Sequence, residues 1–149
     1  MKPKVNGSRL KWLFTAAVLL ALFTGFGNMP LYGRYYLADI PGLQWSGNFI
    51  VNMKVHLVAG AVVLALAVYY LVGMISLRKD QAPRTVLTRF LGIALALVLL
   101  SGLIAGVKNF AIWTPGLALM MTINFFHLGT AMLFTAVGLV FLVVHWKNQ

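Results

Sequence analysis

The chain has 149 residues, of which 61% are hydrophobic and only 9% are charged, a composition far too apolar for a soluble domain of this length. It contains no cysteine, which excludes disulfides, thiolate-ligated iron–sulfur clusters and covalently attached c-type haem. The two acids, Asp39 and Asp80, lie outside the apolar runs, which argues against a proton pump or cation-coupled transporter. The composition therefore predicts an integral membrane protein.

Four apolar segments are each long enough to cross about 30 Å of hydrocarbon as a helix. We expect an all-α fold, an up-down bundle of four transmembrane helices at about 10–27, 49–77, 86–107 and 116–146, forming a single domain over residues 1–149 without an evident internal repeat. A signal peptide is the alternative interpretation of the first segment, since basic residues precede it. The bulky Met29-Pro30-Leu31-Tyr32 that follows it offers no small-residue cleavage site, which favours a retained helix.

Basic residues are divided unequally between the two sides of these helices. Nine fall on one side, namely Lys2, Lys4, Arg9, Lys11, Arg78, Lys79, Arg84, Arg89 and Lys147, and three fall on the other, namely Arg34, Lys54 and Lys108. Because cytoplasmic flanks carry the excess of Lys and Arg, both termini are expected in the cytoplasm of a multi-pass protein of the bacterial inner membrane. The net charge of +10 is then mainly a topology signal with attraction to anionic lipid, and nucleic-acid binding is a poor explanation.

The outer loop over residues 28–48 is the only sizeable segment expected to be non-helical. Pro and Gly divide it into turns, and its aromatic residues, Tyr32, Tyr35, Tyr36 and Trp45, suit a membrane interface. Two interpretations remain open. The loop is an aromatic anchor belt, or it also covers the edge of a cofactor or docks an outer partner.

His56 and His127 each lie inside a long apolar segment, in the predicted outer halves of the second and fourth helices. An imidazole in hydrocarbon needs a partner, so an intramembrane histidine is a candidate functional residue. These two helices run in the same direction, which gives the two histidines compatible depths. Two imidazoles facing each other in a bundle can ligate one b-type haem. The alternative is that each histidine only forms hydrogen bonds with a neighbouring helix.

Small residues follow each histidine by one helical turn and would leave room for a porphyrin. They are Ala59 and Gly60 after His56, and Thr130 and Ala131 after His127. Small residues also let membrane helices pack, as we expect for Gly102 and Gly106 in the third helix. Haem propionates require cations near the interface, for which the outer residues Lys54, Arg34 and Lys108 are candidates, with ordinary snorkelling as the alternative.

His145 lies eighteen residues after His127, at the cytoplasmic end of the fourth helix. An interfacial position is the ordinary interpretation. The functional alternative is a hydrogen-bond partner for a membrane quinone, together with Lys11, Trp12 or Arg89. The first helix offers no histidine that could oppose His145, so one haem is expected.

Several segments together resemble a known family. They are Lys54-Val55-His56-Leu57-Val58-Ala59-Gly60, Phe126-His127-Leu128-Gly129-Thr130-Ala131, and Arg9-Leu10-Lys11-Trp12 followed by Leu22-Phe23-Thr24-Gly25. With the four helices, they are similar to cytochrome b membrane subunits of the formate dehydrogenase gamma type. The resemblance implies an electron-transfer subunit of a hetero-oligomeric oxidoreductase complex, rather than a catalyst alone. Where the family pattern has a histidine for an inner haem this chain has Lys11, so the resemblance implies one outer haem.

The sequence thus predicts a membrane cytochrome b subunit with one haem b between His56 and His127. It would relay electrons between a periplasmic redox subunit and menaquinone or ubiquinone. The main alternative is a haem-free membrane anchor of a larger complex. A small transporter or channel is disfavoured by the missing intramembrane acids and by the lack of two matching Gly/Pro-interrupted helices.

Overall fold

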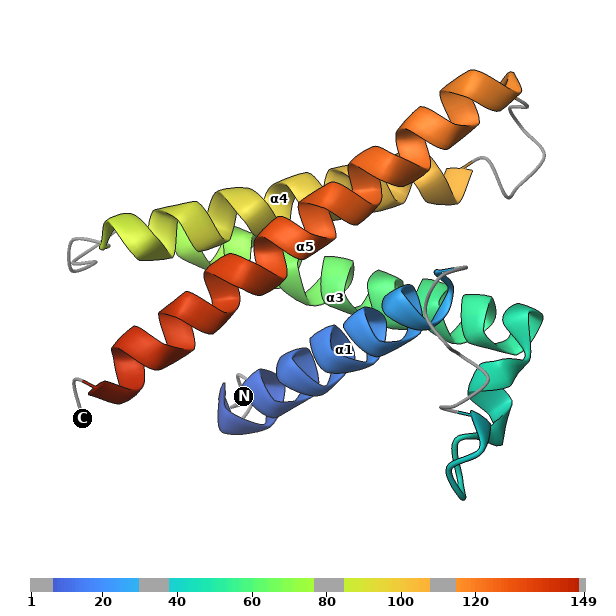
Figure 1. Cartoon of the computed structure of the whole chain (residues 1–149). Coiled ribbons are helices and arrows are strands. Elements are labelled where there is room, and N and C mark those ends of the chain that lie inside the picture. Colours follow the sequence, from blue (N-terminus) through green and yellow to red (C-terminus); the bar gives the residue numbers. More distant parts are fainter. Residues whose placement is uncertain (1–6, 30–37, 77–84, 108–114, 148–149) are drawn as a thin grey trace, which may run out of the picture. The chain divides into compact units, whose positions relative to one another are not determined.

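A computed structural model describes residues 7–29, 38–76, 85–107 and 115–147. Within these ranges the chain forms four long α-helices, a short 3-10 helix and no strand: α1 (Gly7–Gly27), η1 (Gln44–Gly47), α3 (Phe49–Ser76), α4 (Val86–Val107) and α5 (Leu117–Lys147) (Figure 1). Each α-helix contains a segment long and apolar enough to cross a membrane. The predicted all-α fold with four membrane-spanning helices is confirmed, and the helix bounds lie within three residues of those expected.

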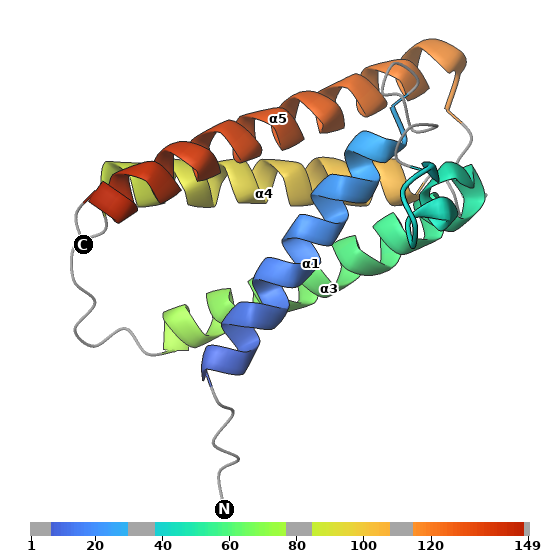
Figure 2. The same cartoon turned by 60° about the horizontal axis from the view of Figure 1, so that its bottom comes forward.

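The chain divides into two compact units, Met1–Arg78 and Lys79–Gln149. In the first hairpin α1 packs against α3 and η1 adds to α3, and in the second hairpin α4 packs against α5. Each pair can be followed in Figures 1 and 2. The first pair is antiparallel, since Phe14 near the start of α1 meets Tyr70 near the end of α3, with ring centroids 6.2 Å apart. The described residues therefore form two helical hairpins, and the single domain predicted from the sequence stays a prediction.

The seam of the first hairpin consists of small or compact side chains. Ala17 and Thr24 of α1 are buried, as are Asn52, Ala59 and Val63 of α3. Pairs of these residues are seven positions apart, which is the spacing that keeps a seam on one face of a helix packed against another. Small residues let the two backbones approach closely, as is typical of helix pairs in membranes.

The second hairpin is built in the same way from Ala94 and Ser101 of α4 and Thr130 of α5, all of which are buried. Its remaining surface is mostly apolar, and large side chains such as Phe90 and Phe125 are more than half exposed, at 57% and 71%. A hydrophobic surface of this kind is expected where helices contact lipid. Membrane lipid is therefore a partner of these helices.

The segment before α3 packs onto the end of the first hairpin where α1 ends and α3 begins. Asn48 caps α3, with Oδ1 accepting hydrogen bonds from the backbone N–H groups of Ile50 at 3.0 Å and Val51 at 3.2 Å. In η1, the ring of Trp45 contacts that of Phe23 in α1, with centroids 6.1 Å apart. Trp45 thus packs within the hairpin, whereas the other predicted anchors, Tyr32, Tyr35 and Tyr36, lie outside the described residues.

Candidate functional site

His56 is held between the two helices of the first hairpin. Its Nδ1 lies 3.0 Å from the backbone oxygen of Ala21 and 3.1 Å from Thr24 Oγ1. A carbonyl oxygen can only accept, so Nδ1 carries the proton and donates. Thr24 Oγ1 donates its own proton to the Leu20 carbonyl at 2.7 Å and turns a lone pair toward the histidine. In this neutral tautomer the imidazole lone pair lies on Nε2.

The residue after Thr24 is a glycine whose missing side chain makes room for the His56 ring. A Cβ at Gly25 would lie 3.1 Å from His56 Cε1 and 3.5 Å from Nδ1. The first of these distances is shorter than an ordinary van der Waals contact between carbon atoms. We use the term histidine seat for a hydroxyl residue that contacts the histidine Nδ1 together with the next residue, a glycine that leaves room for the ring. Thr24-Gly25 is the seat of His56.

A second seat holds His127 in the other hairpin. Ser101 Oγ lies 3.0 Å from His127 Nδ1 and donates to the Val98 carbonyl at 3.1 Å. The Ser101 hydroxyl also lies 3.0 Å from Thr130 Oγ1, where either hydroxyl can be the donor, and Thr130 Oγ1 lies 2.9 Å from the backbone oxygen of His127. A Cβ at Gly102 would lie 2.9 Å from His127 Cε1. Ser101-Gly102 therefore repeats the arrangement of Thr24-Gly25.

The two hairpins share one residue pattern. A buried alanine lies seven positions before each seat hydroxyl. Each histidine is followed directly by a leucine and, three positions after the histidine, by a buried small residue. The residues of this pattern are Ala17, Thr24, Gly25, His56, Leu57 and Ala59 in one hairpin and Ala94, Ser101, Gly102, His127, Leu128 and Thr130 in the other. The hydroxyl and the histidine are 32 residues apart in the first hairpin and 26 in the second. The chain thus carries a structural repeat that the sequence alone did not reveal.

The four residues predicted to pack on a haem have different environments. Ala59 is buried in the α1–α3 seam, and Thr130 is buried with its hydroxyl bonded in the second hairpin. Gly60 and Ala131 are half-buried. A Cβ at Gly60 would meet no atom of the described residues within 4 Å. Gly60 therefore has open space beside it among the described residues.

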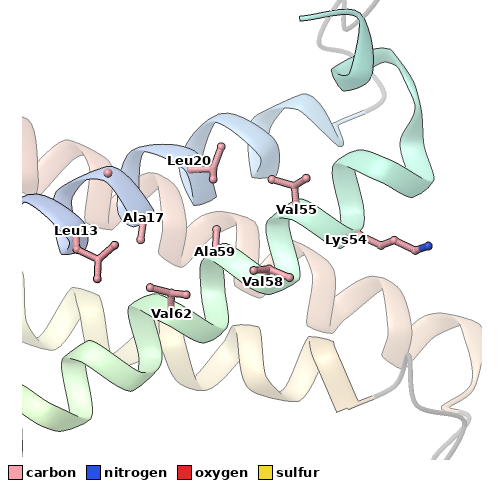
Figure 3. A pocket seen from close by; sticks show the side chains of 9 residues that line it. Leu13, Ala17, Leu20, Lys54, Val55, Val58, Ala59 and Val62 are labelled. Atoms are coloured by element: carbon pink, nitrogen blue, oxygen red, sulfur yellow. The ribbon is translucent and has the colours of Figure 1, made fainter.

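A groove of about 430 Å³ runs along the first hairpin between α1 and α3 (Figure 3). It is lined by Leu13, Ala16, Ala17, Leu20, Lys54, Val55, Val58, Ala59 and Val62. Lys54 is the only charged residue of this lining and extends away from the groove at one end (Figure 3). The groove itself is therefore apolar. The other two predicted propionate partners, Arg34 and Lys108, lie outside the described residues.

The predicted quinone residues are divided between the two hairpins. Lys11 and Trp12 are exposed near the start of α1, with Trp12 76% exposed. Arg89 is exposed in the first turn of α4. His145 belongs to the last turns of α5, and its side chain lies outside the described residues. The quinone assignment stays a prediction.

Sequence reasoning missed Asn52 as a functional candidate, although an amide inside an apolar segment four residues before His56 was a usable signal. Asn52 is 1% exposed, and its Nδ2 donates to the Thr24 carbonyl at 3.1 Å and to Asn28 Oδ1 at 2.9 Å. Its Oδ1 is buried without a hydrogen-bond partner among the described residues. Asn52 thus ties α3 to the backbone of the first seat.

The described part of the chain has no group of three or more His, Cys, Asp or Glu side chains that could hold a metal ion. A haem iron takes four ligands from its porphyrin and needs only two from protein, so two histidines suffice for that group. Comparisons of the chain with protein family models, with curated proteins and with solved structures found no match.

Proposed function

We propose that this chain is a membrane cytochrome b subunit in which His56 and His127 are the two axial ligands of one b-type haem. The observation that carries the proposal is that both histidines hold a seat hydroxyl through the same nitrogen, Nδ1, at 3.1 and 3.0 Å. Histidines that ligate metals characteristically donate their other ring N–H to a fixed acceptor, which sets the tautomer and orients the ring. This arrangement supports Nε2 as the atom that bonds iron in both.

The first hairpin has two features that support room for a large apolar group, and His56 is not among the residues that line its groove. Gly60 leaves space one turn after His56, and the groove beside Ala59 is apolar apart from Lys54 at one end. Haem b is an apolar macrocycle with two propionates, which need cations or donors near the membrane interface. Lys54 is the cation that we propose for one of them, with Arg34 and Lys108 as further candidates.

When bound, the haem supplies one-electron chemistry, and the chain supplies the ligands and their environment. Thr24 and Ser101 orient the imidazoles, and the apolar helices exclude water. We propose that the electrons pass between a periplasmic redox subunit and menaquinone or ubiquinone in a bacterial inner membrane. His145, Lys11, Trp12 and Arg89 are the candidate donors to the quinone, and the chain acts within a hetero-oligomeric complex.

A haem-free membrane anchor is the second candidate function. It is favoured by the fact that each histidine already links the two helices of its hairpin, His56 to Ala21 and Thr24, and His127 to Ser101. Interhelical hydrogen bonds of this kind contribute about 0.6 to 2 kcal/mol each in membranes. In this interpretation the histidines stabilise two hairpins that hold partner subunits.

A reduced-minus-oxidised visible spectrum of the purified full-length chain distinguishes the two functions. The cytochrome proposal predicts a low-spin b-type spectrum, and about one haem per polypeptide by the pyridine haemochrome method, since only one pair of facing histidines is expected. His56→Ala and His127→Ala should each abolish this spectrum, because each removes one bond to the same iron.

His145→Ala is the matched control and should keep the full haem signal. A chain that carries no haem after expression with excess haem supports the anchor function instead. An unchanged six-coordinate spectrum in either His56→Ala or His127→Ala contradicts the ligand assignment.

A further inference from the structure

The Thr24 and Ser101 hydroxyls each lie within hydrogen-bond distance of a backbone carbonyl of their own helix, in addition to the histidine. Only the hydroxyl can donate in each of these contacts: Thr24 Oγ1 is 2.7 Å from the Leu20 oxygen and Ser101 Oγ is 3.1 Å from the Val98 oxygen. A hydroxyl has one proton and two lone pairs. A serine or threonine bonded back to its own helix in this way can therefore offer the histidine only a lone pair.

We propose that Thr24 and Ser101 are positioning residues that act as fixed hydrogen-bond acceptors and hold His56 and His127 in the Nδ1–H tautomer. In the opposite arrangement the hydroxyl would donate to Nδ1, the ring proton would lie on Nε2, and Nε2 would have no lone pair for a metal. The inference that this tautomer serves haem ligation rests on the proposed function, whereas the tautomer itself does not.

The described contacts of Nδ1 differ between the two histidines. At His56 the Ala21 carbonyl accepts from the same Nδ1 at 3.0 Å, so a second group that can only accept enforces the tautomer. At His127 the Ser101 hydroxyl lies 3.0 Å from Nδ1, and its oxygen also lies 3.0 Å from Thr130 Oγ1. We therefore infer that replacing Thr24 alone leaves His56 an acceptor for its Nδ1–H.

The direct measurement is ¹⁵N NMR of the full-length chain with labelled histidine, reconstituted in lipid without haem. The ¹⁵N shift of each ring nitrogen reports whether it is protonated. We expect protonated Nδ1 and unprotonated Nε2 for both His56 and His127, with the His145 signals identified by their loss in His145→Ala.

Substitution of the two hydroxyl residues should change the ¹⁵N shifts of His127 and His56 to different extents. Ser101→Ala should convert His127 from a single tautomer to a mixture and leave His56 unchanged, whereas Thr24→Val should change His56 less, since the Ala21 carbonyl remains. Ser101→Thr and Thr24→Ser should restore the original shifts, because either hydroxyl can bond back to its helix. Thr135→Val is the matched control, a half-buried hydroxyl bonded to the Ala131 carbonyl at 2.8 Å.

Two results would overturn the inference: a protonated Nε2 on His56 or His127 in the unmodified chain, or the same His127 shifts in Ser101→Ala as in Thr135→Val. Both can be read without haem, so they are independent of the proposed function, which fails if the unmodified chain binds no haem. In a chain that does bind haem, Ser101→Ala should also shift the midpoint potential more than Thr24→Val does.

Discussion

Gly102 lies directly against the ring of His127, so that a Cβ at position 102 would come within 2.9 Å of His127 Cε1. The same relationship links Gly25 to His56, at 3.1 Å. Carbon atoms in favourable contact are about 3.5 to 4.0 Å apart. Both glycines are therefore steric requirements of the imidazole positions, and neither can be replaced by alanine without displacing a ring or a helix.

We predict that Gly102→Ala destabilises the second hairpin by about 1–3 kcal/mol, the usual cost of adding a methyl group to a packed interior. The measurement is the free energy of unfolding of the purified chain in mixed micelles. Gly106→Ala is the control in the same helix, since a Cβ there meets no described atom within 4 Å. It should be neutral or stabilising by up to about 1 kcal/mol, as expected for an open helical position. Equal effects of the two substitutions would contradict the contact.

Gly60→Ala tests whether the proposed haem packs against α3 one turn after His56. A Cβ at Gly60 contacts no described residue within 4 Å, so the haem-free chain should keep its stability. If a porphyrin packs there, the added methyl group should weaken haem binding by about fivefold to a hundredfold, which corresponds to an overpacking effect of about 1–3 kcal/mol. Haem titration of the haem-free chain measures this, with Gly73→Ala, also an open position in α3, as control. Unchanged haem affinity in Gly60→Ala would remove this residue from the binding site.

Asn52→Asp should destabilise the first hairpin by about 1–3 kcal/mol, because it keeps the shape of the side chain and removes both N–H groups. The hydrogen bonds lost are those to the Thr24 carbonyl and to Asn28 Oδ1. The measurement is the free energy of unfolding. The control is Thr122→Val, which removes an exposed hydroxyl bonded within α5 to the Ala118 carbonyl. A stability equal to that of Thr122→Val would show that the amide bonds contribute nothing.

The orientation of the helices in the membrane is predicted from the nine-to-three division of basic residues. Reporter fusions after Gln149 and between Arg78 and Arg89 should report the cytoplasm, and a fusion near Asp39 should report the outside. The opposite pattern would place both histidines in the inner leaflet and change the side from which a redox partner approaches.

The helices and the two histidines could be predicted from the sequence because each leaves a local signal. Hydrophobic length fixes a membrane span, and a histidine in such a run is conspicuous. The seats leave no comparable signal. That Thr24 faces His56 from 32 residues away depends on the register between two uniformly apolar helices, which residue types alone do not determine.

The surroundings of the small residues near the histidines likewise could not be predicted from residue types alone. Ala59 and Thr130 follow their histidines by three positions, so they lie on the same helix face. That face is turned toward the other helix of the same hairpin, because the histidine reaches across the seam to its seat. Both residues therefore pack within a hairpin, whereas Gly60, one position after Ala59, has open space beside it among the described residues. The shared pattern of the two hairpins was hidden by unequal spacings of 32 and 26 residues between hydroxyl and histidine.

The order of residues within each hairpin bears on how the protein is made. Thr24 precedes His56, and Ser101 precedes His127, so the acceptor helix has already been synthesised when each histidine leaves the ribosome. A pair of consecutive helices can then enter the membrane with the imidazole N–H already bonded across the hairpin, avoiding the cost of an unpaired polar group in lipid. Insertion in two successive steps, each complete in itself, would give a chain that persists in the membrane before any cofactor is delivered to it.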